Sequence, residues 1–391
     1  MNDRRKKNSS ESAQKGPAKW LPIHLPRTLN VLCPSAFRFS SFPQHPDMKF
    51  IYKRKFIKRI LFGTLIAALL IFAVIFIVIP VIYRYSYVFQ RNLLFLNFVS
   101  VPVDFKHPEK LNLMGARNFY VRTDDNVTIG VWHILPSKFA TSGSQKDTTD
   151  WLNRGDPIFV YMHGNSGNRG TAHRLELYRL LQKNNFHIIA FDYRSYGDSS
   201  PVEPSETGVV NDSKHVYEWV KLKAGSSPIF LWGHSLGSGI ASHLLDILEK
   251  QKEEIQGLVL ESPFNNMSDE IRSYPLARIF KFLPWFDYFF IQPMYDNGLR
   301  FESDVHLSKV SAPIMILHAE DDIVIPIDLG EKLSDSIKKA RISQNSNSPL
   351  IFHPFSKNEG LGHKNIYRAA ELPLYILDFV NNSLAYNQQR S

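Results

Sequence analysis

The five residues Gly233-His234-Ser235-Leu236-Gly237 carry the most specific chemistry in this sequence. They follow an apolar run of strand type, residues 228–232, and precede a stretch in which Leu or Ile recurs at 236, 240, 244 and 248. A G-x-S-x-G sequence between a strand and a helix is a nucleophile elbow, a sharp turn that lifts a serine hydroxyl above a sheet. The flanking glycines are expected because a Cβ would collide where strand and helix pack closely. We therefore predict that Ser235 is a catalytic nucleophile.

A serine hydroxyl needs a histidine to take its proton and an acid to hold that histidine in place. In the doubly wound hydrolase scaffold these groups follow the order serine, acid, histidine. The predicted strand 313–317 leads into a loop with Asp321 and Asp322, and such sheets keep their sites just beyond the C-terminal ends of strands. We prefer Asp322 as the acid, with Asp321 as the alternative or as a turn-forming aspartate. His363, on a glycine-lined turn 41 residues beyond Asp322, is the predicted base.

Acyl transfer also requires donors for the tetrahedral oxyanion. One expected donor is the backbone N–H of Leu236, which follows the nucleophile at a helix N-terminus. The other is the N–H of Asn165, in the turn after the strand that ends at His163-Gly164. Two further histidines are expected to support the site, His318 by ordering the acid loop and His234 within the elbow.

Several segments around these residues resemble the α/β-hydrolase superfamily. They are Tyr161-Met162-His163-Gly164-Asn165-Ser166-Gly167, Phe191-Asp192-Tyr193-Arg194-Ser195-Tyr196-Gly197-Asp198-Ser199, Gly233–Gly237 and Leu317–Asp322. Two more, Glu261-Ser262-Pro263-Phe264-Asn265-Asn266 and Gly362-His363-Lys364-Asn365-Ile366-Tyr367, resemble the membrane-anchored abhydrolase-domain-containing protein twelve group. The similarity covers roughly residues 85–385.

That group consists of monoacylglycerol and lysophosphatidylserine lipases. The resemblance implies that Ser235, Asp322 and His363 form the triad. It also implies an endoplasmic-reticulum membrane protein whose active site faces the lumen, and it implies no metal or organic cofactor. The sequence departs from the group at Ser195, where glycine usually follows Arg194. A serine there must tolerate the geometry of the turn, and because it lies off the triad it bears on local stability more than on activity.

Short apolar runs that alternate with helical patterns are expected to position these residues. The predicted strands are 118–122, 127–135, 158–162, 187–191, 229–232, 258–260, 314–317 and 350–352, and the predicted helices are 171–183, 206–223, 236–252 and 329–339. Strands without polar alternation, separated by helices, indicate a parallel sheet covered on both faces. The fold class is therefore α/β, with a mostly parallel, doubly wound sheet of the α/β-hydrolase type and a hairpin at its start.

Residues 60–82 form an uncharged run of 23 residues, long enough as a helix, roughly 35 Å, to cross a bilayer. Six basic residues precede the run within about ten positions, and two follow it. The positive-inside rule then predicts a signal anchor with a cytosolic N-terminus and a C-terminal domain across the membrane. Sequons on that side make four asparagines possible glycosylation sites. They are Asn126, Asn211, Asn266 and Asn381.

The charge distribution argues against nucleic-acid binding. Residues 1–59 hold 14 basic and 3 acidic side chains, whereas the other 332 residues hold 32 basic and 34 acidic ones. A nucleic-acid-binding domain carries the positive charge itself, and here the excess lies in an arm that we predict to be cytosolic and disordered. Cys33 is the only cysteine, so an internal disulfide and a zinc site with several cysteine ligands are both excluded.

An insertion before the acid strand, about residues 265–310, is predicted to form a cap. Eight of the sixteen residues from 280 to 295 are aromatic. One interpretation is a cap held to the domain by its aromatic side chains. The other is an acyl-binding lid that also lies in the membrane interface, with Trp285, Phe286 and Phe289 as candidate substrate contacts.

We therefore expect an arm (1–59), an anchor (60–82), a juxtamembrane linker (83–112) and a hydrolase domain (113–391). The predicted activity is ester hydrolysis of single-chain glycerolipids through an acyl-enzyme, with a lipid substrate and a membrane as the partners. A peptidase or thioesterase that uses the same triad is an alternative within enzymes. A catalytically silent membrane scaffold is the alternative from another class. The oligomeric state does not follow from the sequence.

Overall fold

The computed structural model describes residues 46–140 and 151–390. The chain divides after Leu65, and the unit that begins at Ile66 contains the sheet and the predicted site. Most of the predicted N-terminal arm lies outside the described residues. Residues 46–59 of that arm are helical rather than disordered, because apolar side chains alternate there with basic ones and no proline or glycine follows Pro46.

One eight-stranded sheet forms the centre of the fold, in the order β1-β2-β4-β3-β5-β6-β7-β8. The first two strands form the predicted antiparallel hairpin, β2 is antiparallel to β4, and the remaining neighbours are parallel. The bounds are β1 Ala116–Arg122, β2 Thr128–Ile134, β3 Ile158–Met162, β4 His187–Phe191, β5 Ile229–His234, β6 Gly257–Glu261, β7 Ile314–Ala319 and β8 Leu350–Phe355. The predicted α/β sheet is confirmed.

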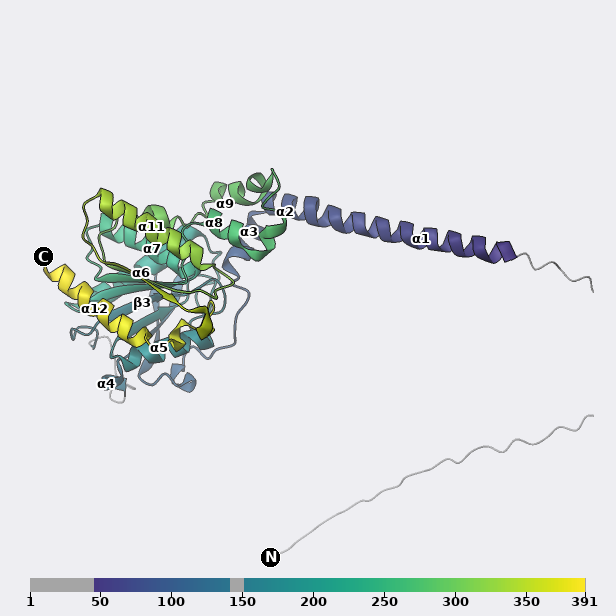
Figure 1. Ribbon diagram of the computed structural model, residues 1–391. Coiled ribbons are helices and arrows are strands. Elements are labelled where there is room, and N and C mark those ends of the chain that lie inside the picture. The colour runs from purple at the N-terminus through teal and green to yellow at the C-terminus, as the bar shows by residue number, and fades with distance from the viewer. Residues whose placement is uncertain (1–45, 141–150, 391) are drawn as a thin grey trace, which may run out of the picture. The chain divides into compact units, whose positions relative to one another are not determined.

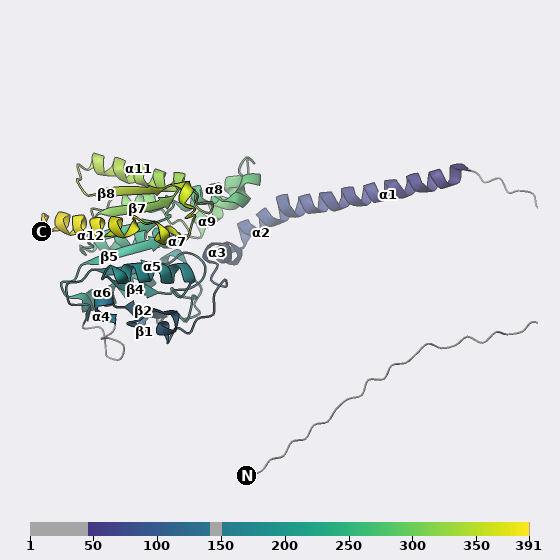
Figure 2. The ribbon, with the colours of Figure 1, turned by 60° about the horizontal axis from the view of Figure 1, so that its bottom comes forward.

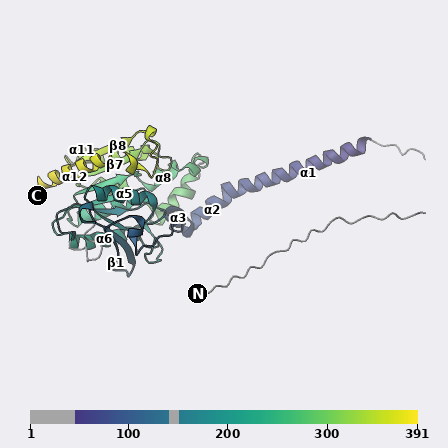
Figure 3. The same ribbon diagram turned by 90° about the horizontal axis from the view of Figure 1, so that it is seen from below.

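Helices cover both faces of this sheet (Figures 1–3). On one face lie α6 (Glu206–Ala224), α7 (Leu236–Lys250) and α11 (Ile327–Ser343), and on the other lie α5 (Ala172–Lys183) and α12 (Leu372–Gln388). Side chains that alternate along each strand divide between two cores, one on each face. This two-sided burial explains the apolar strands without polar alternation.

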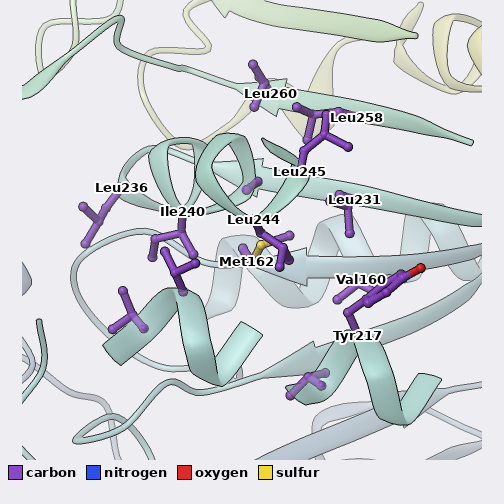
Figure 4. Close-up of a cluster of buried hydrophobic side chains, with 14 of the residues drawn as sticks. Val160, Met162, Tyr217, Leu231, Leu236, Ile240, Leu244, Leu245, Leu258 and Leu260 are labelled. Atoms are coloured by element: carbon purple, nitrogen blue, oxygen red, sulfur yellow. The ribbon is translucent and has the colours of Figure 1, made fainter. Parts of the chain in front are cut away.

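Helix α7 shows how the apolar stripe of the elbow is used. Leu236, Ile240 and Leu244 lie on its sheet-facing side and are buried, packed with Val160 and Met162 of β3 (Figure 4). Full burial of each such side chain stabilises the fold by about 1.5–3 kcal/mol. The helix is therefore held firmly against the sheet, and its first turn is fixed beside the strand ends.

The cap insertion lies between β6 and β7 and consists of short helical pieces. They are α8 (Met267–Ser273), the 3₁₀ helix Pro275–Ile279, the π-helical turn Asp287–Ile291, α9 (Gln292–Asp296) and α10 (Ser303–Leu307). Outside the cap, shorter helical segments include α4 (Ser137–Ala140) and the 3₁₀ turns Pro108–Leu111, Lys357–Glu359 and Ile366–Arg368. Buried Phe280, Phe286 and Phe290 form a small aromatic core in the cap insertion.

The predicted anchor is part of a longer helical stretch. Phe50–Tyr85 is the one helical stretch among the described residues that is long and apolar enough to span a membrane. It comprises most of α1 (Pro46–Ala73), a π-helical turn Val74–Val78 and α2 (Ile79–Tyr85). Pro80 stands at the start of α2, where a proline ring interferes with the preceding helical turn, and a π-turn widens the helix at that point. A further helix, α3 (Tyr87–Phe95), follows directly.

Candidate active site

Ser235 lies at the turn between β5 and α7 with φ 56° and ψ −122°. A non-glycine residue in this region is strained by about 1–3 kcal/mol. The turn is possible only because its neighbours are glycines. A Cβ on Gly233 would lie 2.4 Å from the Gly237 carbonyl oxygen, and a Cβ on Gly237 would lie 2.1 Å from the Met162 carbonyl oxygen. The predicted elbow is thus present, with the serine hydroxyl held beyond the C-terminal end of the central strands.

His363 connects the serine to an acid. Its Nε2 atom is 2.9 Å from Ser235 Oγ, and its Nδ1 atom is 2.7 Å from Asp322 Oδ2. The Nδ1–H donates to the carboxylate, so Nε2 is free to accept the proton of the serine hydroxyl. The histidine stands in the loop after β8, where Gly360 and Gly362 have positive φ values of 64° and 53°.

The two neighbouring aspartates have different contacts. Asp322 Oδ1 accepts the backbone N–H groups of Val324 and Ile325, both at 2.9 Å, while its other oxygen faces His363. Burial raises the pKa of Asp322, but the hydrogen bond and charge of His363 lower it overall, so the acid stays ionised. Asp321 Oδ1 instead accepts the N–H of Gly362 at 2.9 Å. Asp321 therefore holds the loop that carries His363. The sequence analysis had considered it as an aspartate that bonds within its own turn.

Two other histidines brace the site. His234 Nε2 lies 2.9 Å from the carbonyl oxygen of His363, and His318 Nε2 lies 2.9 Å from the carbonyl oxygen of Ile325. Burial lowers the pKa of His234 well below its usual range, and burial also lowers the pKa of His318. Both rings are therefore neutral at pH 7 and donate one hydrogen bond each to a backbone carbonyl.

The predicted oxyanion donors flank the nucleophile. Leu236 is the first residue of α7, so its N–H has no acceptor within the helix. Asn165 follows β3, and the adjacent Gly164 is so close that a Cβ there would lie 3.2 Å from Ser235 Cβ. The side-chain amide of Asn165 donates to the Leu94 carbonyl oxygen at 3.1 Å, which fixes the turn and leaves the backbone N–H for a ligand.

A buried polar network holds this oxyanion turn and was not found from the sequence. Asp192 accepts from Arg169 Nη1 at 2.5 Å and lies 3.2 Å from His163 Nε2, while His163 Nδ1 is 2.7 Å from the Gly164 carbonyl oxygen. Arg174 donates to the Ser166 carbonyl oxygen at 2.7 Å. These groups are buried and paired with one another, so together they fix the turn. Truncation of any one of them would leave a buried polar or charged partner without a hydrogen bond and would destabilise the fold. The polar motif around Asp192 was the signal available in the sequence.

Beside the oxyanion turn lies a cavity of about 510 Å³, here called the cap cavity. Its lining includes Asn165 but neither Ser235 nor His363, so the cavity extends from the oxyanion side of the nucleophile. One wall comes from the cap insertion. The opposite wall comes from the end of the apolar helix, α2 and α3, including Ile79, Tyr83 and Leu94.

The three aromatic residues proposed as substrate contacts are placed differently. Phe286 lines the cap cavity and is buried. Trp285 and Phe289 are not among its lining residues and pack against each other, with ring centroids 5.5 Å apart, on the aromatic core of the cap insertion. The α3 wall lies within residues 83–112, for which the sequence analysis predicts a juxtamembrane linker. The apolar run at 93–96 was the available signal.

The four sequon asparagines lie outside the site. Asn126 and Asn381 are exposed, whereas Asn211 and Asn266 are half-buried. Asn266 caps α8 through its Oδ1, and its Nδ2 donates to Asp304 Oδ2 at 2.8 Å, so a glycan would be attached at an atom that already makes a hydrogen bond.

One cluster away from the triad contains residues of metal-binding type. One potential ligand atom from each of Glu206, His243 and His306 lies within 4.8 Å of the other two. The two rings stack with centroids 4.0 Å apart and planes 16° apart, so their in-plane lone pairs run side by side instead of converging. Each ring also has a carboxylate partner, Glu206 for His243 and Asp246 for His306. We assign no metal to this cluster.

Comparison with known proteins agrees with this geometry. Residues 157–293 match the family model described as alpha/beta hydrolase fold. The chain is 40% identical over 313 residues to the lysophosphatidylserine lipase ABHD12 of Rattus norvegicus, covering 79% of this chain and 78% of that protein. It is also 40% identical over 315 residues to the Xenopus tropicalis protein of the same name, covering 79% and 81%.

Among solved structures, the Pyrococcus furiosus esterase Pf2001 aligns with a TM-score of 0.52 at 18% identity. The alignment covers 71% of this chain and 93% of that chain, and it supports the fold alone. The resemblance drawn from the sequence motifs is confirmed by the relatives of higher identity. The chain belongs to the ABHD12 family of α/β hydrolases.

Proposed function

We propose that this protein is a membrane-anchored serine hydrolase that cleaves acyl esters of single-chain glycerolipids. The observation that carries the proposal is the hydrogen-bonded line from Asp322 through His363 to Ser235, beside an apolar cavity of about 510 Å³. The lipid class is supported by the relatives, which are named lysophosphatidylserine lipases.

In this mechanism His363 Nε2 takes the hydroxyl proton of Ser235 as Oγ attacks the ester carbonyl carbon. Asp322 stabilises the imidazolium that forms. The oxyanion is stabilised by the N–H groups of Leu236 and Asn165, which are already held in position. His363 then protonates the leaving glycerol oxygen, an acyl-enzyme remains, and a water molecule activated by His363 releases the fatty acid and restores the serine.

The cap cavity suits the apolar part of such a substrate. Its volume lies within the roughly 300–1,000 Å³ typical of small-molecule pockets, and such pockets bury mostly apolar ligand surface. Its walls are Leu, Ile, Met and aromatic side chains with few polar groups. A peptidase would need polar groups along an extended groove to bind peptide backbone, and a silent scaffold would not need three residues in hydrogen-bonding order. Both observations favour the lipid esterase.

We also propose a single-pass topology in the endoplasmic-reticulum membrane, with a cytosolic N-terminus and a lumenal hydrolase domain. It is supported by the 36-residue apolar helical stretch and by the basic residues on its N-terminal side. In sealed microsomes, protease added outside should leave the hydrolase domain intact. Digestion of that domain without detergent would contradict the orientation.

The function is tested by hydrolysis of a long-chain 1-acylglycerol and of lysophosphatidylserine by the full-length protein in membranes. Ser235→Ala is expected to abolish turnover of both, because no other group can form the acyl-enzyme. Ser242→Ala is the matched control, since Ser242 lies two helical turns along α7 and its hydroxyl bonds only the Ser238 carbonyl oxygen, at 2.7 Å. Turnover that survives in Ser235→Ala would refute the proposal. Faster turnover of an amide or thioester than of either lipid would favour the alternative enzymes.

A further inference from the structure

One polar side chain of the cap cavity is used neither by the triad nor by the fold. Glu270 lies on α8 of the cap insertion, and among the described residues that line the cap cavity it alone carries a carboxylate or a basic group. Its Oε2 atom is shielded from solvent and has no hydrogen-bond partner. A buried polar atom without a partner costs about 1–3 kcal/mol. A group that occupies the cavity can remove that cost.

The charged neighbours of Glu270 on α8 are committed elsewhere. Asp269 accepts from Asn265 Nδ2 at 2.9 Å and from Lys332 Nζ at 3.2 Å. Arg272 donates to Asp287 Oδ1 at 2.5 Å. Glu270 is therefore distinguished from them by its place on the cavity wall, and it is not part of a surface ion-pair network.

The two amide side chains that line the cavity are also hydrogen-bonded. The Gln90 amide donates to the Tyr83 carbonyl oxygen at 2.6 Å and accepts from Asn297 Nδ2 at 2.7 Å. The Asn165 amide donates to Leu94. Among the amide and carboxyl groups that line the cavity, Glu270 is the one with a buried oxygen left for a ligand.

The electrostatic surroundings select the kind of ligand. Burial and, to a smaller extent, the negative charge of Asp322 together raise the pKa of Glu270 to about 7. A phosphate beside Glu270 and Asp322 would add a third negative charge in an apolar space, which is unfavourable. An ammonium group would need the ionised carboxylate, which the same surroundings disfavour. An uncharged hydroxyl can donate to the carboxyl group in either protonation state.

We propose that Glu270 binds a free hydroxyl group of the glycerol moiety of a single-chain glycerolipid in the cap cavity. This inference rests on the proposed function and deepens it. A free glycerol hydroxyl is what a single-chain glycerolipid retains and a fully acylated one has lost. Glu270 is thus a specificity-determining residue that distinguishes single-chain esters, while the phosphate of a lysophospholipid points away from it.

The test compares two substrates with the same long acyl chain, a 1-acylglycerol and its 2,3-di-O-methyl ether, which has no hydroxyl donor. The enzyme variants are Glu270→Leu, which keeps the volume without a polar group, and Glu270→Gln, which keeps an acceptor oxygen. Glu331→Gln on the exposed side of α11 is the matched control. The readout is the ratio of kcat/KM values for the two substrates, with the thermal unfolding midpoint of each variant as a check on folding.

We expect Glu270→Leu to lower kcat/KM for the 1-acylglycerol about tenfold, equal to about 1.4 kcal/mol, and to leave the ether unchanged. Glu270→Gln should stay within about threefold of wild type for both, because its amide oxygen accepts from the same hydroxyl. An equal loss on both substrates in Glu270→Leu, or no loss on either, would overturn the assignment. If Glu270→Leu fails to fold, Glu270→Met, which is close to Glu in length and lacks the carboxyl group, takes its place with the same expected and contrary results.

The same measurements separate this inference from the proposed function. Suppose that wild type hydrolyses both esters, that Ser235→Ala hydrolyses neither, and that the ratio of kcat/KM values is the same in wild type and in Glu270→Leu. Then only the hydroxyl assignment fails. If wild type hydrolyses neither ester, or Ser235→Ala hydrolyses both, the proposed function fails and the hydroxyl assignment fails with it.

Discussion

The catalytic end of the sheet and the cap cavity are adjacent but are built in different ways. Ser235 and Asp322 stand just after the buried strands β5 and β7, and His363 stands in the loop after β8; glycines and backbone hydrogen bonds fix these loops. The cap cavity is assembled from short helical pieces and from residues before the first strand, around a small aromatic core. The positions of the catalytic residues are thus fixed by the loops at the strand ends. The shape of the cap cavity depends instead on segments that are distant in the sequence.

This difference has an experimental consequence. Substitutions at the catalytic end should reduce the hydrolysis of every ester, because each ester uses the same nucleophile and base. Substitutions in the cap cavity should change which esters are hydrolysed and leave the reaction itself intact.

The two neighbouring aspartates give the largest contrast. Asp322→Asn is expected to lower kcat about 10⁴-fold for all esters, because an amide neither holds the required tautomer of His363 nor stabilises its imidazolium. Asp321→Asn should stay within about threefold of wild type, since its amide oxygen still accepts the Gly362 N–H. Steady-state kinetics with one long-chain and one short-chain ester measure both. Similar losses in the two variants would show that the acid has been misassigned.

Filling the cap cavity should separate long from short acyl chains. Ala277 lines the cavity and is buried, so Ala277→Trp places an indole where the chain of the substrate would lie. We expect kcat/KM for a long-chain 1-acylglycerol to fall roughly 10- to 100-fold, which matches the free-energy cost typical of overpacking. For a butyrate ester, kcat/KM should stay within about twofold of wild type. Ala370→Trp, at an exposed position, is the control. Equal losses on both chain lengths would place the acyl chain elsewhere.

A carboxyl group beneath the catalytic end should make stability depend on pH. Burial raises the pKa of Glu261 to about 7, against about 4.3 in an unfolded chain. The folded state binds this proton more tightly than the unfolded state. The resulting contribution of Glu261 to the free energy of unfolding is therefore complete below about pH 4 and is lost as the pH rises through about 7. Glu261→Gln keeps an acceptor for Trp232 Nε1, so it should exceed wild type at pH 8 by on the order of 3 kcal/mol and match it at pH 4.

Thermal unfolding of wild type and Glu261→Gln in detergent, across that pH range, measures this effect. Glu331→Gln serves as the control for a charge removed from the surface. Parallel pH profiles for wild type and Glu261→Gln would mean that Glu261 is ionised in the folded protein, contrary to the burial argument.

The smallest effect concerns a second strained serine. Ser195 has φ 68°, in the left-handed region that favours glycine, and its Oγ accepts from Asn97 Nδ2 at 2.6 Å. Ser195→Gly relieves strain of about 1 kcal/mol and loses one hydrogen bond of similar worth. We expect unfolding free energy to change by less than about 1 kcal/mol and kcat to be unchanged. A large loss of activity would mean that the turn positions the active site.

The catalytic end was predictable from sequence because its residues stand beside strand-like runs and glycines that report the local backbone. Asp321 was harder, since its partner Gly362 is 41 residues away and an aspartate in a turn has several local explanations. The wall formed by α2 and α3 was missed for the same kind of reason. Its apolar residues follow the anchor without a periodic pattern, and only tertiary contacts such as Tyr83 with Phe290, 5.1 Å between ring centroids, give them a role.

The central claim is that Ser235 is the nucleophile of a lipid esterase, and labelling by a fluorophosphonate tests it most directly. The full-length protein is labelled in its membranes and the modified peptide is identified by mass spectrometry. We predict one adduct, on Ser235, absent in Ser235→Ala and slowed by prior addition of a long-chain 1-acylglycerol. An adduct on another residue, or no adduct on a folded protein, would contradict the account.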